Sequence, residues 1–188
     1  HCLMCKIYFA RPDSMTFGND AENYFRFLCG MESARLFPVP DADFVGYMPD
    51  SGRHFAEGFA YASGKPIFSI YVRNPYILGR TFINPVPVDR ETYSNLKYHL
   101  MRDILKTENE ICKNKIVVLC DDSIIRGITL GKRVPELLEA GAEEVHVRVG
   151  APRTANPCYY GMDFPQKSEL IASDKTEEDM RDFFRATS

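Results

Sequence analysis

Short apolar runs alternate with segments of helical spacing along most of the chain. Apolar runs of strand length cover residues 43–48, 67–72, 115–120 and 144–149. Apolar or small residues recur at helical spacing over residues 54–63, 91–106, 130–140 and 176–185. Strands that alternate with helices usually pair in parallel. The sequence therefore predicts an α/β fold in which helices flank a mainly parallel, twisted sheet.

Glycine and proline mark where several of these segments end. Gly64-Lys65-Pro66 follows the segment 54–63, and Gly141 follows the segment 130–140, so both are predicted to stop helices. Residues 73–87 are rich in proline, glycine and arginine and have no period, which predicts a loop.

Composition narrows the class of protein. The chain has 188 residues, enough for one domain or for one domain with a small subdomain, and we expect one domain over residues 1–188. A net charge of -3 gives no basic excess for binding nucleic acid. No apolar segment is long enough to cross a bilayer, and the start does not resemble a signal peptide, so we expect a cytoplasmic protein and no membrane partner. Because the first residue is His1 and not methionine, we expect a piece of a longer protein.

The six cysteines favour reduced thiols over a disulfide framework. Cys120, for example, lies inside an apolar strand. Cys2 and Cys5 form a CxxC pair, but no second CxxC or HxxxH pair completes the four ligands that a structural zinc ion needs.

The most informative stretch is "VVLCDDSIIRGITLG" at residues 117–131. A glycine at a helix start, here Gly127, allows successive N–H groups to point at one anion, most often a phosphate. Thr129 adds a hydroxyl donor and Arg126 a positive charge. The carboxylates of Asp121 and Asp122 repel phosphate, but they suit ribose hydroxyls or a hydrated Mg²⁺. The stretch therefore predicts a site for a ribose 5-phosphate.

Two other interpretations of the acidic pair stay open. Acidic residues also follow strands as simple caps and turns. A phosphoacceptor receiver domain has such a pair as well, although there it follows the first strand of the domain. A second polar turn, residues 49–53, also follows a strand. Because ligands bind outside the carboxyl ends of parallel strands, we expect the turns 49–53 and 121–129 at one edge of the sheet.

The stretch 117–131 resembles the PRPP-binding signature of type I phosphoribosyltransferases, where PRPP is phosphoribosyl pyrophosphate. More narrowly, the chain is similar to the amidophosphoribosyltransferase family. The similarity runs from end to end in matching order, through "IYFARPDS", "MPDSG", "GRTFI", "ELLEAGAEEVHVRVGAP" and "NPCYYGMDFPQKSELIA". It implies a phosphoribosyltransferase fold with a parallel sheet of about five strands and a small hood.

The resemblance also implies roles for individual residues. Asp121 and Asp122 would hold the ribose hydroxyls and Mg²⁺, and Arg80 would touch the pyrophosphate; these three are the catalytic candidates. Residues 126–130 would bind the 5-phosphate, with Thr129 a direct ligand, and residues 73–80 would close over PRPP. The full set of candidate substrate-binding residues is Asp50, Ser51, Gly52, Arg73, Tyr76, Arg80, Asp121, Asp122, Ser123, Arg126, Gly127, Ile128 and Thr129.

The implied reaction transfers ammonia to PRPP, releases pyrophosphate and gives 5-phosphoribosylamine for purine biosynthesis. The family's glutaminase domain, which supplies ammonia in cis or in trans, has no counterpart in these residues. Cys2 and Cys158 match two ligands of a 4Fe-4S cluster found in some members; the other two ligands would lie beyond Ser188. A homo-oligomer and inhibition by purine nucleotides are further expectations from the family.

Some positions depart from the family pattern. Arg73 stands where a lysine is usual, "PYILGR" has one extra residue, and Ile128 replaces a common threonine. Two alternative functions therefore stay open: a type I phosphoribosyltransferase that acts on a base, and a non-catalytic regulatory module that binds PRPP.

Overall fold

The computed structural model describes residues 2–74, 98–101, 112–160, 162 and 166–188. In chain order, the helices and strands are the π-helix η1 (Cys5–Phe9), α1 (Glu22–Leu36), β1 (Phe44–Tyr47), α2 (Arg53–Ser63), β2 (Ile67–Phe68), β3 (Tyr71–Arg73), β4 (Tyr98–Leu100), β5 (Ile116–Asp121), α5 (Leu130–Glu139), β6 (Glu144–Val149), the 3-10 helices η2 (Lys167–Glu169) and η3 (Ile171–Ser173), and α6 (Glu177–Phe184).

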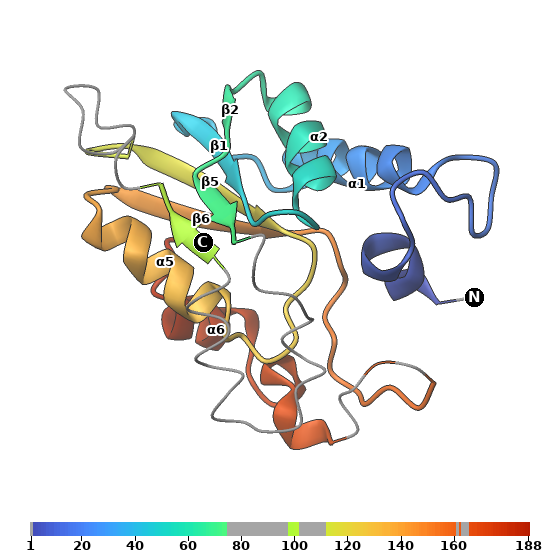
Figure 1. Ribbon diagram of the computed structural model, residues 1–188. Helices are drawn as coiled ribbons and strands as arrows, with labels where there is room; N and C mark the ends of the chain where they lie inside the picture. The colour runs from blue at the N-terminus through green and yellow to red at the C-terminus, as the bar shows by residue number, and fades with distance from the viewer. Residues whose placement is uncertain (1, 75–97, 102–111, 161, 163–165) are drawn as a thin grey trace.

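The described strands form a parallel sheet in the order β2-β1-β5-β6 and a separate antiparallel pair of β3 and β4. Helices α1 and α2 lie on one face of the parallel sheet, and α5 and α6 lie on the other (Figure 1). The predicted α/β fold with a mainly parallel sheet is confirmed.

Strand β5 carries the core on both of its faces. Val117 and Leu119 pack into the apolar cluster that contains residues of α5 and α6, whereas Val118 and Cys120 pack into the cluster beneath α1 and α2. All four side chains are 0% exposed. Burial on both faces explains why this strand reads as an unbroken apolar run. It also fixes the position of the residues that follow at its carboxyl end.

Most predicted elements are confirmed to within one residue at each end. This holds for strands 43–48, 115–120 and 144–149 and for helices 54–63, 130–140 and 176–185. Gly64 ends α2 in the left-handed conformation with φ 70°, as predicted for a glycine stop.

The single strand predicted over residues 67–72 is wrong, because the chain forms two strands that belong to different sheets. β2 pairs with β1, whereas β3 pairs with β4. Between them, the side chain of Ile70 occupies the space above Gly46, where an added Cβ would lie 2.4 Å from Ile70 Cδ1. A continuous apolar run gives no sign of such a change of sheet.

The helix predicted over residues 91–106 is wrong at its described residues. Residues 98–100 form β4, and Leu100 pairs with Tyr71 across the antiparallel ladder. Leu100 is buried in the core, but it packs there as part of a strand and not as part of a helix face. The remainder of that predicted helix lies outside the described residues.

Helix α1 has no counterpart among the predicted elements. Its buried positions, spaced four residues apart, are Glu22, Arg26, Gly30 and Ala34, so its inward face carries charge and small side chains in place of large apolar ones. The glycine allows close packing: a Cβ on Gly30 would lie 1.9 Å from the carbonyl oxygen of Phe55 in α2. Apolar periodicity cannot detect a face of this kind.

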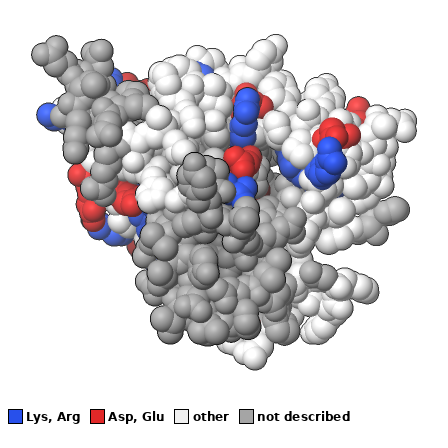
Figure 2. Space-filling view, viewed as in Figure 1, with Lys and Arg blue, Asp and Glu red and all other residues white. Residues whose placement is uncertain are grey.

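Within the described residues, no helix is both long enough and apolar enough to cross a membrane. The face shown in Figure 2 carries mostly uncharged residues in its described part, and several of the charged ones lie beside residues of opposite sign.

Candidate functional site

The acidic pair lies at the carboxyl end of β5. Asp121 is the last residue of this strand, and both Asp121 and Asp122 are 6% exposed. The N–H of Asp122 donates to Oδ1 of Asp121 at 2.9 Å, and the hydroxyl of Ser123 donates to Oδ2 of Asp122 at 2.7 Å. The chain after β6 fixes the backbone of the pair, because Gly150 N–H donates to the Asp121 carbonyl at 3.1 Å. These bonds hold both carboxylates in defined orientations.

The turn after β1 lies directly against the pair. A Cβ on Gly52 would lie 2.8 Å from the carbonyl oxygen of Cys120 and 3.1 Å from Cα of Asp121. Ser51 and Asp122 line one small pocket. The peptide bond between Pro49 and Asp50 is cis. The two turns thus meet at one edge of the sheet, as predicted.

The segment 126–130 leads into α5 through a turn that requires glycine. Gly127 has φ 75°, and a Cβ there would lie 2.8 Å from Cδ1 of Ile171. Gly131 N–H donates to the Gly127 carbonyl at 2.9 Å, which starts the helix. Among the described residues, the N–H groups of residues 127–130 donate to no acceptor. Ile128 and Thr129 are half-buried beside them. This arrangement of donors suits a phosphate.

The guanidinium of Arg126 is bound by a carboxylate that sequence reasoning missed. Nε of Arg126 donates to Oε2 of Glu169 at 2.8 Å, and Nη2 contacts the same oxygen. Glu169 lies 43 residues away in η2. The charge of Arg126 is therefore shared with Glu169, so the backbone of residues 127–130 and Thr129 remain the more direct donors for an anion.

Asp50 and Arg73, both predicted site residues, form an ion pair. Nη1 of Arg73 donates to Oδ2 of Asp50 at 2.8 Å, and both side chains are partly or largely exposed. The hydrogen bond to Asp50 raises the pKa of Arg73 above its ordinary value. The contact joins the end of β3 to the turn after β1. The predicted residues Tyr76 and Arg80 lie outside the described residues.

Tyr98 on β4 is another residue near the acidic pair that sequence reasoning missed. Burial raises the pKa of its hydroxyl well above the ordinary value, and the negative charge of Asp121 adds to the effect. The hydroxyl of Tyr98 is thus held in its protonated form, in which it can donate a hydrogen bond. Because residues 91–106 were predicted to form a helix, the position of Tyr98 on a strand near the acidic pair was not predicted.

The acidic pair offers donor atoms for a metal ion. The carboxylate oxygens of Asp121 and Asp122 are hard ligands that suit Mg²⁺, which usually keeps several waters and binds one or two carboxylates together with substrate phosphates. No cluster of three or more His, Cys, Asp or Glu residues placed for a metal occurs in the described part of the chain. Cys2 is exposed and Cys158 is half-buried, and two thiols are too few for a four-iron cluster. The iron–sulfur ligand roles stay a prediction about a longer protein.

No protein-family model matches the chain. The curated amidophosphoribosyltransferase of Methanocaldococcus jannaschii is 44% identical over 179 residues, which cover 95% of this chain and 36% of that protein. The amidophosphoribosyltransferase of Archaeoglobus fulgidus is 43% identical over 187 residues, covering 100% of this chain and 39% of that protein. The rat protein of the same name is 37% identical over 187 residues, which cover 100% of this chain and 34% of that protein.

Solved structures agree with these relatives. The glutamine PRPP amidotransferase from B. subtilis, complexed with ADP and GMP, superposes with a TM-score of 0.81 at 39% identity, covering 100% of this chain and 39% of that chain. The structure described as the allosteric regulatory enzyme of purine biosynthesis superposes with a TM-score of 0.80 at 38% identity, covering 99% of this chain and 38% of that chain. The chain thus spans less than two fifths of the length of these proteins.

Proposed function

We propose that this chain, which is homologous to one segment of the amidophosphoribosyltransferases, binds PRPP at the carboxyl edge of its parallel sheet and transfers the phosphoribosyl group to ammonia. The observation that carries this proposal is the contact between the Gly52 turn and the acidic pair. The strand that leads into the acidic pair continues to a glycine turn at the start of α5, whose N–H groups donate to no acceptor among the described residues. A sugar phosphate with a second anionic group matches these three parts.

Each part has one task in the proposed mechanism. Asp121 and Asp122 accept hydrogen bonds from the ribose hydroxyls, and the N–H groups of residues 127–130, with Thr129, bind the 5-phosphate. The turn 50–52 and Arg73 lie beside the pyrophosphate. Holding both ends of the sugar phosphate fixes C1 relative to the incoming nitrogen, which lowers the entropic part of the barrier.

In the transfer itself, the bond from C1 to the pyrophosphate oxygen breaks and a bond from C1 to the ammonia nitrogen forms. The nitrogen then loses a proton to solvent, and pyrophosphate departs with the bonding pair. The sugar passes through an oxocarbenium-like state, as in glycoside cleavage. Asp121 and Asp122 would hold Mg²⁺ together with PRPP, and the ion would supply positive charge beside the leaving group. Arg80 is proposed to contact that group as well, and Tyr76 to take part in closing the site.

The partners proposed for the complete protein follow its relatives. A glutaminase domain, in cis or in trans, supplies the ammonia, and purine nucleotides inhibit the reaction. We also propose a cytoplasmic homo-oligomer. The relative solved with ADP and GMP supports the proposal of nucleotide binding.

The test is pyrophosphate release from PRPP and Mg²⁺, with concentrated ammonium at alkaline pH in one reaction and glutamine in a parallel one. We expect release with ammonia and none with glutamine. Asp121→Asn and Asp122→Asn should each reduce the rate at least about a hundredfold. The control is Asp41→Asn, an exposed aspartate in the turn before β1, which should behave as wild type. Equal rates for all four proteins would refute the proposed site, and release that requires a purine or pyrimidine base would indicate the alternative transferase.

A further inference from the structure

Behind the acidic pair lies a buried arginine that belongs to none of the motifs. Arg26 comes from the inward face of α1 and is 5% exposed. It lines the same small pocket as Asp122, Ser51 and Gly150. A charged side chain buried in this way normally has a partner that compensates for its lost hydration.

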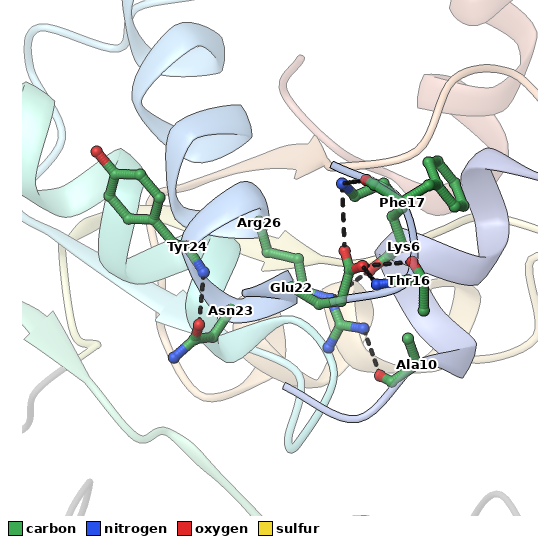
Figure 3. Close-up of polar contacts among 8 residues, drawn as sticks. All are labelled: Lys6, Ala10, Thr16, Phe17, Glu22, Asn23, Tyr24 and Arg26. Atoms are coloured by element: carbon green, nitrogen blue, oxygen red, sulfur yellow. Dashed lines mark hydrogen bonds and ion pairs between the residues drawn. The ribbon is translucent and has the colours of Figure 1, made fainter. Parts of the chain in front are cut away.

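Two backbone carbonyls fix the position of this guanidinium. Nε of Arg26 donates to the carbonyl oxygen of Lys6 at 2.8 Å, and Nη2 donates to that of Ala10 at 2.7 Å (Figure 3). Both carbonyls belong to the segment that contains η1. Nη1 donates to no group among the described residues. The guanidinium is therefore held by two of its nitrogens, and its charge is not cancelled by these neutral acceptors.

A second buried pair holds the segment that carries these carbonyls. Glu22, one helical turn before Arg26, is 0% exposed and lies 3.7 Å from Nζ of Lys6. Oε1 of Glu22 accepts the N–H of Thr16 at 3.0 Å, and Nζ of Lys6 donates to the carbonyl of Phe17 at 2.7 Å. Figure 3 shows these contacts converging on one end of α1. These contacts hold the segment that binds the guanidinium of Arg26.

Asp122 lines the same pocket as Arg26, and its negative charge acts on the guanidinium. Burial lowers the pKa of Arg26 below its ordinary value, and the negative charge of Asp122 opposes this more strongly than that of Glu22 does. Two adjacent buried carboxylates repel each other. A fixed positive charge in the same pocket as Asp122 attracts that carboxylate and offsets its repulsion by Asp121.

We propose that Arg26 is a positioning residue for the acidic pair, acting on the ribose of the bound sugar phosphate through Asp122 without touching the ligand. This inference rests on the proposed function, because it assumes that Asp121 and Asp122 hold the ribose hydroxyls. It assigns the segment 5–10 a part in ligand binding, since that segment fixes the guanidinium.

Two substitutions separate the charge of Arg26 from its anchoring bonds. Arg26→Gln keeps a donor for a carbonyl but removes the charge, whereas Arg26→Lys keeps the charge in a different shape. Both lose anchoring bonds, so both should lower the melting temperature of the unliganded chain. Arg35→Gln is the control, because Arg35 lies on the same helix, is largely exposed and pairs only with Glu32 in the described residues.

Binding is measured by calorimetric titration with two ligands, ribose 5-phosphate and PRPP with Mg²⁺. We expect Arg26→Gln to weaken both ligands by the same factor, about tenfold, and Arg26→Lys to stay within about threefold of wild type. Arg35→Gln should match wild type.

The outcomes that contradict the proposal are distinct. Equal binding by wild type and Arg26→Gln, or equal losses in the Gln and Lys variants, would reduce Arg26 to an anchor of the segment 5–10. A loss confined to PRPP would mean that Arg26 contacts the pyrophosphate directly. If the wild-type chain binds neither ligand, the proposed function falls together with this inference. Binding without turnover leaves the inference intact, because the measurement needs no catalysis.

Discussion

Gly52 and Asp121 approach so closely that a Cβ on Gly52 would lie 3.1 Å from Cα of Asp121. The same Cβ would lie 2.8 Å from the carbonyl oxygen of Cys120 and 3.0 Å from that of Met48. Each of these neighbours is a backbone atom in or next to a strand of the sheet, so none can move aside as a side chain would. The missing side chain at position 52 is what allows the two polar turns to form one site.

Gly52→Ala should therefore damage binding and stability together. We expect the free energy of unfolding to fall by about 1–3 kcal/mol, because backbone must shift to admit the methyl group. PRPP should no longer raise the melting temperature measurably. Gly64→Ala serves as the control for lost stability: it is strained at φ 70° but meets nothing within 4 Å. Retained PRPP binding in Gly52→Ala would contradict this account of the turn.

The packing of α1 on α2 gives a second prediction, on stability. A Cβ on Gly30 would lie 1.9 Å from the carbonyl oxygen of Phe55 and 2.8 Å from N of Phe59. Gly30→Ala forces the two helices apart, and we expect it to lower the free energy of unfolding by roughly 3 kcal/mol in denaturant titration.

Gly131→Ala in α5 is the matched control, because the nearest atom packed against its Cβ from outside the helix would be Cε1 of Phe183, at 3.4 Å. Alanine is favoured over glycine inside a helix by about 0.5–1 kcal/mol, so this variant should be at least as stable as wild type. If the two variants were equally stable, the close approach of α1 and α2 would be wrong.

The parts of the site that are local in sequence could be predicted, and the parts that are assembled from distant segments could not. Asp121, Asp122 and Gly127 belong to one short stretch. Its apolar run, its acidic pair and its glycine can each be interpreted from the neighbouring residues alone. Glu169 reaches the site through its contact with Arg126, which lies 43 residues earlier in the chain. Arg26 reaches it from α1, a helix whose inward face carries charged residues. Neither contact has a signal in hydrophobic spacing.

Errors in the predicted elements have the same origin. An apolar run such as residues 67–72 specifies burial, but the sheet to which each half belongs depends on partners elsewhere in the chain. Tyr98 was assigned to a helix because its pairing partner, Arg73 on β3, could not be recognised from spacing.

His146 provides a test of pH dependence. The side chain lies on β6, where Nδ1 contacts Oγ of Ser188 at 2.8 Å and Nε2 contacts Oε2 of Glu144 at 2.9 Å. Burial lowers the pKa of His146 below its ordinary value of 6.5, although the hydrogen bond to Glu144 opposes the shift. The unfolded chain therefore takes up this proton at a higher pH than the folded chain does. The contribution of His146 to the free energy of unfolding is therefore fully present above about pH 6.5, and it decreases as the pH falls below that value.

The measurement is the melting temperature of wild type and His146→Gln across the range from about pH 7.5 to 5.5. We expect the wild-type melting temperature to decrease more steeply toward acid than that of the variant, since glutamine keeps a hydrogen-bonding group but cannot take up a proton. Parallel curves for the two proteins would show that His146 makes no contribution to the pH dependence.

The ion pair of Arg73 and Asp50 is expected to matter for the ligand and little for the fold. Exposed pairs contribute about 0.2–1 kcal/mol, so Arg73→Met and Asp50→Asn should each change the melting temperature only slightly. If Arg73 lies beside the pyrophosphate, Arg73→Met should weaken PRPP by about tenfold, the usual scale for one charged hydrogen bond. Ribose 5-phosphate lacks the pyrophosphate, and its binding should be unchanged.

Asp50→Asn separates two roles that the pair could have. The carboxylate of Asp50 accepts a hydrogen bond from Nη1 of Arg73 at 2.8 Å. It therefore competes with an anionic ligand for this donor. Removal of that negative charge should therefore tighten PRPP binding and again leave ribose 5-phosphate unaffected. Weaker PRPP binding in Asp50→Asn would mean instead that Asp50 holds Arg73 in the orientation that the pyrophosphate needs. The double variant, measured with both ligands, gives the coupling energy that decides between competition and orientation.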